Sequence, residues 1–177
     1  MSPDRRPVDD VDEVVSAWRR ERPDLDVTPL EVLSRVSRLA RRLDLARGSA
    51  FAEQHLESWA FDVLSALRRA GEPYELSPGQ LVQQTLVTSG TMTNRVDRLE
   101  RQGWVERHPD PADRRGVLVR LSPSGRDVVD AAMANLIEQE KALLLQLSAP
   151  EQSQLATLLR RLLAPLERHD GRRLDQR

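Results

Sequence analysis

The stretch 77–121, SPGQLVQQTLVTSGTMTNRVDRLERQGWVERHPDPADRRGVLVRL, decides the fold of this chain. Its first residues are typical of a helix start, with Ser77 as N-cap, proline at the first helical position and Gln80 at the third. Thr88 can cap a second helix, and Gly103 would end it. Apolar residues recur at helical spacing in both segments, at Leu81, Val82 and Leu86 and then at Met92, Val96 and Leu99. The pattern predicts two short helices joined by a tight turn.

A β-hairpin is predicted directly after the second helix. Trp104–Arg107 indicates one strand, and residues 108–115 form a polar loop with two prolines. Apolar side chains then alternate at Val117, Val119 and Leu121, as on a returning strand. The sequence therefore predicts a winged helix-turn-helix, mainly α with a small β-hairpin wing.

The outward face of the second helix suits DNA. Small hydroxyls, amides and arginines are the groups with which proteins contact base edges and phosphates in the major groove. The candidate DNA contacts are Ser89, Thr91, Thr93, Asn94 and Arg98 on the helix, with Arg114 and Arg115 at the hairpin tip. A wing tip meets the minor groove or the backbone. A solvated helix with an ordinary turn is the alternative, but the order helix, turn, helix and basic wing favours double-stranded DNA.

The runs NRVDRLERQGWVER (94–107) and DPADRRG (110–116) resemble the recognition helix and wing of the MarR family of bacterial regulators. The resemblance extends over most of the chain, from Thr28 to Glu167. It implies a dimeric winged-helix repressor that releases DNA when a small ligand binds. The peroxide-sensing branch of the family needs a reactive cysteine, and this chain contains none.

Composition limits the other possibilities. The formal net charge is -1, so DNA affinity must come from a local basic patch. Without cysteine, disulfides and thiol chemistry are excluded. No apolar run could span a membrane and no signal peptide is recognisable, which predicts a bacterial cytoplasmic, nucleoid-associated protein without a membrane partner. The three histidines fit no metal or triad pattern and no glycine-rich phosphate loop is present, so we predict no enzyme, cofactor, catalytic residue or metal site.

The chain divides into five predicted segments: an N-terminal extension with a short helix (1–27), helices of the core and of dimerisation (28–76), the DNA-binding module (77–121), C-terminal dimerisation helices (122–167) and a charged tail (168–177). Asp9 or Asp10 can cap the first helix, which would dock through Trp18. The two C-terminal helices carry more apolar face than one small domain can cover. They predict a homodimer formed through the N- and C-terminal helices.

The helix from Thr28 is expected to stop at Gly48, and a second helix over Phe51–Ala70 is apolar on several sides, as a buried central helix is. Asp62 lies in this helix without a cation three or four residues away. A carboxylate in such surroundings needs a partner or water. Arg95 falls on the flank of the recognition helix that faces the protein, so an Asp62–Arg95 ion pair is predicted.

Four residues resemble the ligand residues of the urate-responsive branch of the family. That branch associates its ligand with a tryptophan on the N-terminal helix, an aspartate on the central helix, an arginine on the recognition helix and an arginine at the start of the wing. The matching residues here are Trp18, Asp62, Arg95 and Arg107. The spacings between the last three match, whereas the tryptophan spacing differs. The alternative gives each residue a structural or phosphate-binding role.

The function predicted from the sequence is a ligand-responsive transcriptional repressor, released from a pseudo-palindromic operator by urate or a similar small planar anion. Two alternatives stay open. One is a MarR-type regulator that senses a different small organic anion. The other is an architectural DNA-binding protein with no ligand.

Overall fold

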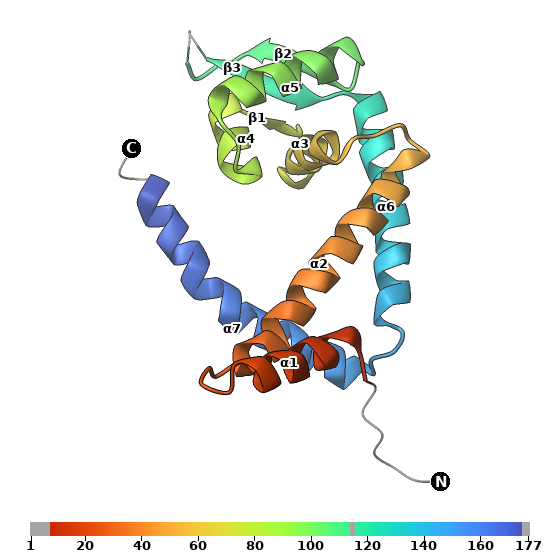
Figure 1. Ribbon diagram of the computed structural model, residues 1–177. Coiled ribbons are helices and arrows are strands. Elements are labelled where there is room, and N and C mark those ends of the chain that lie inside the picture. Colours follow the sequence, from red (N-terminus) through yellow and green to blue (C-terminus); the bar gives the residue numbers. More distant parts are fainter. Residues whose placement is uncertain (1–7, 114–115, 175–177) are drawn as a thin grey trace. The chain divides into compact units, whose positions relative to one another are not determined.

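The computed structural model describes residues 8–113 and 116–174, and the chain divides into two compact units, residues 1–136 and 137–177. Mainly helical with one small antiparallel sheet, the structure confirms the predicted fold class (Figure 1). In chain order the elements are α1 (Asp10–Glu21), α2 (Thr28–Ala52), α3 (Ser58–Arg69), β1 (Glu75–Leu76), α4 (Pro78–Thr85), α5 (Ser89–Arg101), β2 (Val105–Pro109), β3 (Val117–Leu121), α6 (Pro123–Leu144) and α7 (Ala149–Leu174).

The starts of α4 and α5 and the end of α5 form as the sequence predicts. The Ser77 hydroxyl accepts the N–H of Gln80 at 3.3 Å, and the Gln80 side chain accepts the N–H of Ser77 at 2.8 Å. This reciprocal capping box satisfies two backbone donors that have no partner inside the helix. Thr88 caps α5 by accepting the N–H of Thr91 at 3.3 Å. Gly103 follows α5 with φ +73°, the left-handed conformation that often ends a helix.

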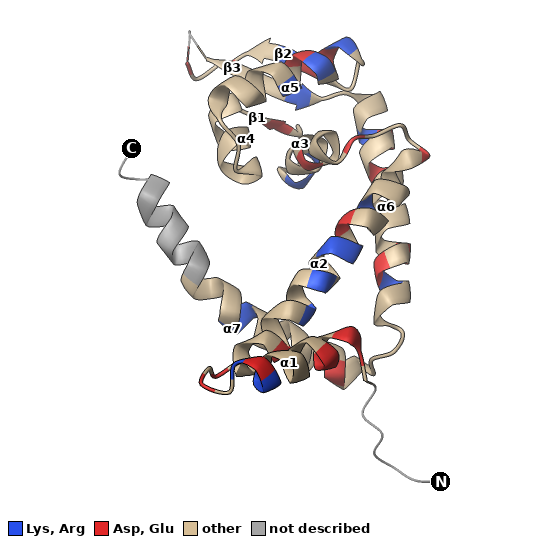
Figure 2. Ribbon diagram, in the orientation of Figure 1, with Lys and Arg blue, Asp and Glu red and all other residues tan. Residues whose placement is uncertain are grey.

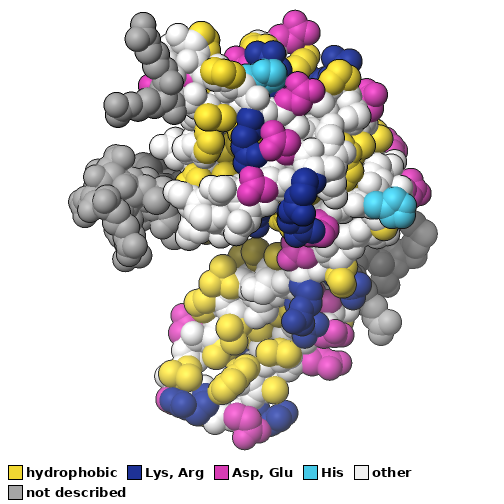
Figure 3. Space-filling model, turned by 90° about the horizontal axis from the view of Figure 1, so that it is seen from above, with side chains coloured by type: hydrophobic (Ala, Val, Ile, Leu, Met, Phe, Trp, Pro, Cys, Tyr) yellow, Lys and Arg dark blue, Asp and Glu magenta, His cyan; other side chains and the backbone are white. Residues whose placement is uncertain are grey.

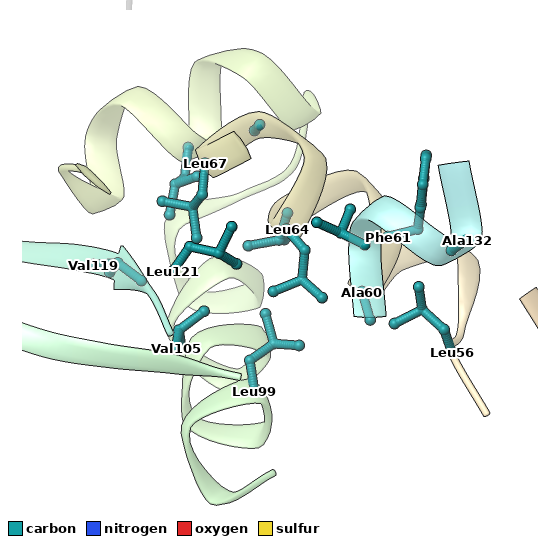
Figure 4. Close-up of a cluster of buried hydrophobic side chains, with 14 of the residues drawn as sticks. Leu56, Ala60, Phe61, Leu64, Leu67, Leu99, Val105, Val119, Leu121 and Ala132 are labelled. Carbon is teal, nitrogen blue, oxygen red and sulfur yellow. The ribbon is translucent and has the colours of Figure 1, made fainter. Parts of the chain in front are cut away.

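The core forms around α3, which is buried as predicted but begins at Ser58 rather than at Phe51, because Phe51 belongs to the last turn of α2. Leu64 and Leu67 are fully buried, as is Leu99 on the inner face of α5. Their side chains extend into one cluster with Val105 and Leu121 from the wing strands (Figure 4). Burying one leucine side chain stabilises a fold by about 1.5–3 kcal/mol. The recognition helix α5 is therefore held in place by the same core that holds the wing.

The sheet has three strands in the order β1-β3-β2, all antiparallel. β2 and β3 form the predicted hairpin, with Val105 opposite Leu121 and Pro109 opposite Val117. The prediction missed β1, whose two residues are too few to show an alternating pattern. An ion pair of 2.6 Å between Glu75 and Arg120 joins β1 to β3.

Two predictions about helix ends are wrong. Gly48 does not stop α2, which continues to Ala52. A helical glycine costs only about 1 kcal/mol relative to alanine, and burial of Phe51 in the main core outweighs that cost because its side chain is 1% exposed. Leu86 is not an inward position of α4: it is the left-handed C-cap, with φ +53° and 82% of its surface exposed.

The continuity of α2 through Gly48 yields a stability prediction. A methyl group added at Gly48 would meet no atom within 4 Å. Gly48→Ala is therefore expected to raise the free energy of unfolding by about 0.5–1 kcal/mol, because alanine loses less backbone entropy in a helix. Urea unfolding followed by circular dichroism measures this change. The matched control is Gly103→Ala, which should destabilise because φ is +73° there. A loss of stability in Gly48→Ala would mean that α2 is broken at this point.

The N-terminal helix α1 packs on α2, with charge complementarity between the two helices (Figure 2). Asp9 is its N-cap and accepts the N–H of Val11 at 2.9 Å. Arg35 of α2 donates to Asp9 at 2.8 Å, and this hydrogen bond lowers the pKa of the Asp9 carboxyl. Val11 and Val15 bury the inner face of α1. Trp18 is 48% exposed, so the prediction that α1 docks through this tryptophan is wrong.

In the second unit, α7 begins where the sequence predicts, after Ser148, whose N–H donates to Glu151 at 2.7 Å. The predicted charged tail begins at residue 168, but the structure is helical there, because α7 continues to Leu174. Residues 175–177 of that tail lie outside the described residues. Several leucines of α7 are exposed, namely Leu155, Leu158, Leu162 and Leu163. Within the described chain, none of the helices has the length and apolarity needed to cross a membrane.

Candidate nucleic-acid interface

The outward face of α5 carries the predicted contact residues. Ser89, Thr91, Thr93 and Asn94 are all exposed, whereas the opposite face packs into the core. The hydroxyls of Thr91 and Thr88 lie 2.9 Å apart, and the Thr93 hydroxyl donates to the carbonyl of Ser89 at 3.1 Å. Among the described residues, the Asn94 amide has no hydrogen-bond partner. Asn94 therefore offers both a donor and an acceptor, the combination that pairs with the major-groove edge of adenine.

Arg98, also predicted as a DNA contact, is held at the flank of α5 by residues at the start of α3. Its guanidinium donates to Glu57 at 2.7 Å and lies 4.7 Å from the ring centre of Trp59. The indole N–H of Trp59 donates to the second carboxylate oxygen of Glu57. The hydrogen bonds from Trp59 and then from Arg98 lower the pKa of the Glu57 carboxyl. We call these three residues the Glu57–Trp59–Arg98 cluster.

Neither Glu57 nor Trp59 is among the residues predicted from the sequence to be functional. Trp59 is recognisable there only as an apolar position of the central helix. The sequence carries no signal for Glu57, because its partner Arg98 lies 41 residues further along the chain.

Arg107 fastens the base of the wing to α5. Its guanidinium donates to Asp97 at 2.5 Å and also to Glu100, both on α5. Partial burial disfavours the charged form, but the two carboxylates outweigh it and raise the pKa of Arg107 above its ordinary value. Because two carboxylates of α5 share this guanidinium, strand β2 is held against the recognition helix. A ligand could use these donors only by displacing a carboxylate.

The predicted Asp62–Arg95 ion pair is wrong. Within the described residues, neither side chain takes part in an ion pair. Asp62 is exposed on α3, so water solvates the carboxylate and no protein cation is required. Arg95 is half-buried, and its guanidinium lies 5.6 Å from the ring centre of Trp59. The tryptophan beside Arg95 is therefore Trp59.

Trp18 lies far from this region of its own protomer. The neighbouring Arg19 pairs with Glu31, near the first turn of α2, at 2.5 Å. α3 follows the last turn of α2, which has 25 residues and is therefore about 38 Å long at 1.5 Å per residue. The helices that carry Trp18 and Asp62, α1 and α3, lie towards opposite ends of α2 in one protomer (Figure 1).

The wing hairpin closes through backbone hydrogen bonds. The N–H of Asp110 donates to the carbonyl of Gly116 at 3.0 Å, and the N–H of Gly116 donates to that of Asp113 at 2.8 Å. The two predicted wing-tip contacts, Arg114 and Arg115, lie outside the described residues.

On the face shown in Figure 3, basic and acidic side chains are interspersed. Among the described side chains, no group of histidines and carboxylates could hold a metal ion.

The comparisons with known proteins agree with this architecture. A sequence model of the MarR family matches residues 56–116. The HTH-type transcriptional regulator PecS of Dickeya dadantii is 38% identical over 152 residues, which cover 86% of this chain and 92% of PecS. The chain belongs to the MarR family.

Two solved structures extend the comparison of this MarR-family chain. An Escherichia coli MarR variant complexed with operator DNA is 28% identical, with a TM-score of 0.65, and the match covers 78% of this chain and 99% of MarR. Bordetella bronchiseptica BpsR, whose DNA binding is regulated by 6-hydroxynicotinic acid, is 29% identical with a TM-score of 0.56. That match covers 72% of this chain and 98% of BpsR. The family predicted from the recognition helix and wing is thus confirmed, and the chain is a transcriptional regulator of the winged-helix type.

Proposed function

We propose that this protein is a transcriptional repressor that binds a pseudo-palindromic operator as a homodimer and leaves it when a small planar anion binds. The observation that carries the proposal is the division of α5 into two faces. The inner face is fixed in the core, whereas the outer face presents Thr91 and Asn94 to solvent. MarR, which shares this fold, binds operator DNA.

The homodimer is supported by apolar surface that the protomer leaves uncovered. In the first unit, Val32 and Leu33 of α2 are 53% and 54% exposed. In the second unit, Leu162 and Leu163 of α7 are 51% and 52% exposed. A two-fold partner that presents the same helices would cover both stripes. Sedimentation should then report a dimer.

A two-fold dimer also fixes the geometry of the operator. Its two recognition helices would enter the major groove about one helical turn apart, or ~10 base pairs between half-sites. Footprinting should show two protected half-sites at this spacing. Protection of one isolated half-site by a monomer would contradict the proposal.

Arg95 is the cation best placed to receive a small planar anion. It is half-buried beside Trp59 and, in the described part of the chain, has no carboxylate partner. A guanidinium is flat and can donate two parallel hydrogen bonds to an anion. Urate is the first candidate, and 6-hydroxynicotinic acid, which regulates BpsR, is the second.

We place Asp62 and Arg107 near the same anion, with Trp18 of the partner subunit as an apolar wall. An anion beside the Asp62 carboxylate would be repelled unless one of them moves. That repulsion provides the link from ligand to the helices that hold α5. A ligand that favours the non-binding state by ~1–3 kcal/mol changes DNA affinity by one or two decades.

Removal of the Asp62 charge tests the ligand response separately from DNA binding. Asp62→Asn should bind operator as tightly as the wild type but require at least ~10-fold more urate for release, which corresponds to ~1.4 kcal/mol of lost coupling. The matched control is Asp44→Asn, an exposed carboxylate on α2. Fluorescence anisotropy of labelled operator measures both affinity and release. Release of Asp62→Asn at the wild-type urate concentration would contradict the charge-repulsion mechanism.

A further inference from the structure

The Glu57–Trp59–Arg98 cluster places a protein carboxylate on a side chain that the DNA-binding face needs. Arg98 follows Thr91 and Asn94 by seven and four residues, so it continues their stripe along α5. Its side chain is 49% exposed and remains accessible from solvent. The Glu57 carboxylate accepts from the guanidinium at 2.7 Å, which is also an ordinary distance for a hydrogen bond from arginine to a phosphate oxygen.

Glu57 is itself held in place. One carboxylate oxygen accepts from Arg98 and the other from the indole N–H of Trp59. The face of the Trp59 ring lies against the Arg98 guanidinium, a favourable contact for a cation. The carboxylate therefore meets Arg98 in a preformed geometry.

We propose that Glu57 is an intramolecular competitor of DNA for Arg98, and that the Glu57–Trp59–Arg98 cluster sets the affinity of the regulator below the value that α5 could reach. Arg98 can donate to Glu57 or to a phosphate or base edge of the operator, but the same N–H cannot do both. The inference rests on the proposed binding of DNA through α5. It adds a residue at the start of α3 that tunes this binding without touching DNA.

The size of the effect follows from the exposure of the pair. Exposed ion pairs contribute roughly 0.2–1 kcal/mol. Removing the competing carboxylate should therefore tighten operator binding by up to about fivefold. An increase in affinity is informative, because damage to the fold could only weaken binding.

The test is a double-mutant cycle on the full chain, with operator affinity measured by fluorescence anisotropy. Glu57→Gln should tighten binding by up to about fivefold, whereas Arg98→Ala should weaken it. In the Arg98→Ala background, Glu57→Gln should have no further effect. The matched control is Glu53→Gln, in the same loop, because Glu53 accepts from the neutral Asn135 side chain. Circular dichroism of each variant checks that the helices are retained.

Failure of this inference can be distinguished from failure of the proposed function. Weaker binding by Glu57→Gln would show that Glu57 orients Arg98 for DNA and would overturn the proposal. An equal gain in the Arg98→Ala background, or in Glu53→Gln, would reduce the effect to the general loss of a negative charge and would also overturn it. Wild-type protein that binds no operator would instead disprove the proposed function on which the inference rests.

Discussion

Gly125→Ala is expected to destabilise the protein by about 3 kcal/mol or more. Gly125 lies in the first turn of α6, and a methyl group there would overlap the carbonyl oxygen of Trp104. It would also lie 2.9 Å from the carbonyl carbon of Trp104 and 3.0 Å from a methyl group of Leu121. Overpacking against flexible side chains typically costs 1–3 kcal/mol, and a backbone carbonyl can move less than a side chain.

The same substitution should disturb the wing. Ser122 and Ser124 both donate to the carbonyl of Gly103, at 2.7 and 2.9 Å, and tie the start of α6 to the end of α5. Chemical unfolding of Gly125→Ala beside Gly48→Ala, where the added methyl group has open space, isolates the cost of the clash. A Gly125→Ala midpoint equal to that of the wild type would mean that α6 does not approach Trp104 so closely.

Asn94→Ala is expected to weaken binding to the specific operator by about 1–3 kcal/mol, or roughly 5- to 150-fold. Asn94 is exposed on α5, and an asparagine amide can form two hydrogen bonds with one adenine edge. Binding to unrelated DNA should change little, because that binding depends on phosphate contacts. Gln102→Ala, at the C-terminal end of the same helix, is the matched control. An equal loss on operator and unrelated DNA would assign Asn94 to the backbone rather than to a base.

Features determined by neighbouring residues could be predicted from the sequence. The capping box at Ser77, the cap at Thr88 and the glycine end of α5 each depend on side chains within four residues. The apolar stripe of α5 likewise follows from helical periodicity. These local signals predict which face of α5 is exposed and carry the resemblance to the family.

Features that depend on tertiary contacts could not be predicted. Gly48 resembles a helix end, but burial of Phe51 keeps α2 continuous. Helical geometry places Arg95 on the flank that faces the protein, yet it cannot tell which partner is there. The structure places Trp59 beside Arg95. The contact between Glu57 and Arg98 depends on the packing of the start of α3 against α5, which joins residues 41 positions apart in the sequence.

In the proposed function, α5 holds an operator that a planar anion releases. The most direct measurement is a gel shift on the DNA upstream of the gene for this protein, with urate titrated into the complex. We expect a retarded band that disappears at up to millimolar urate in the wild type and persists in Arg95→Ala. A band that withstands millimolar urate and 6-hydroxynicotinic acid would contradict the ligand response, and the absence of any retarded band on this or a selected operator would contradict the claim as a whole.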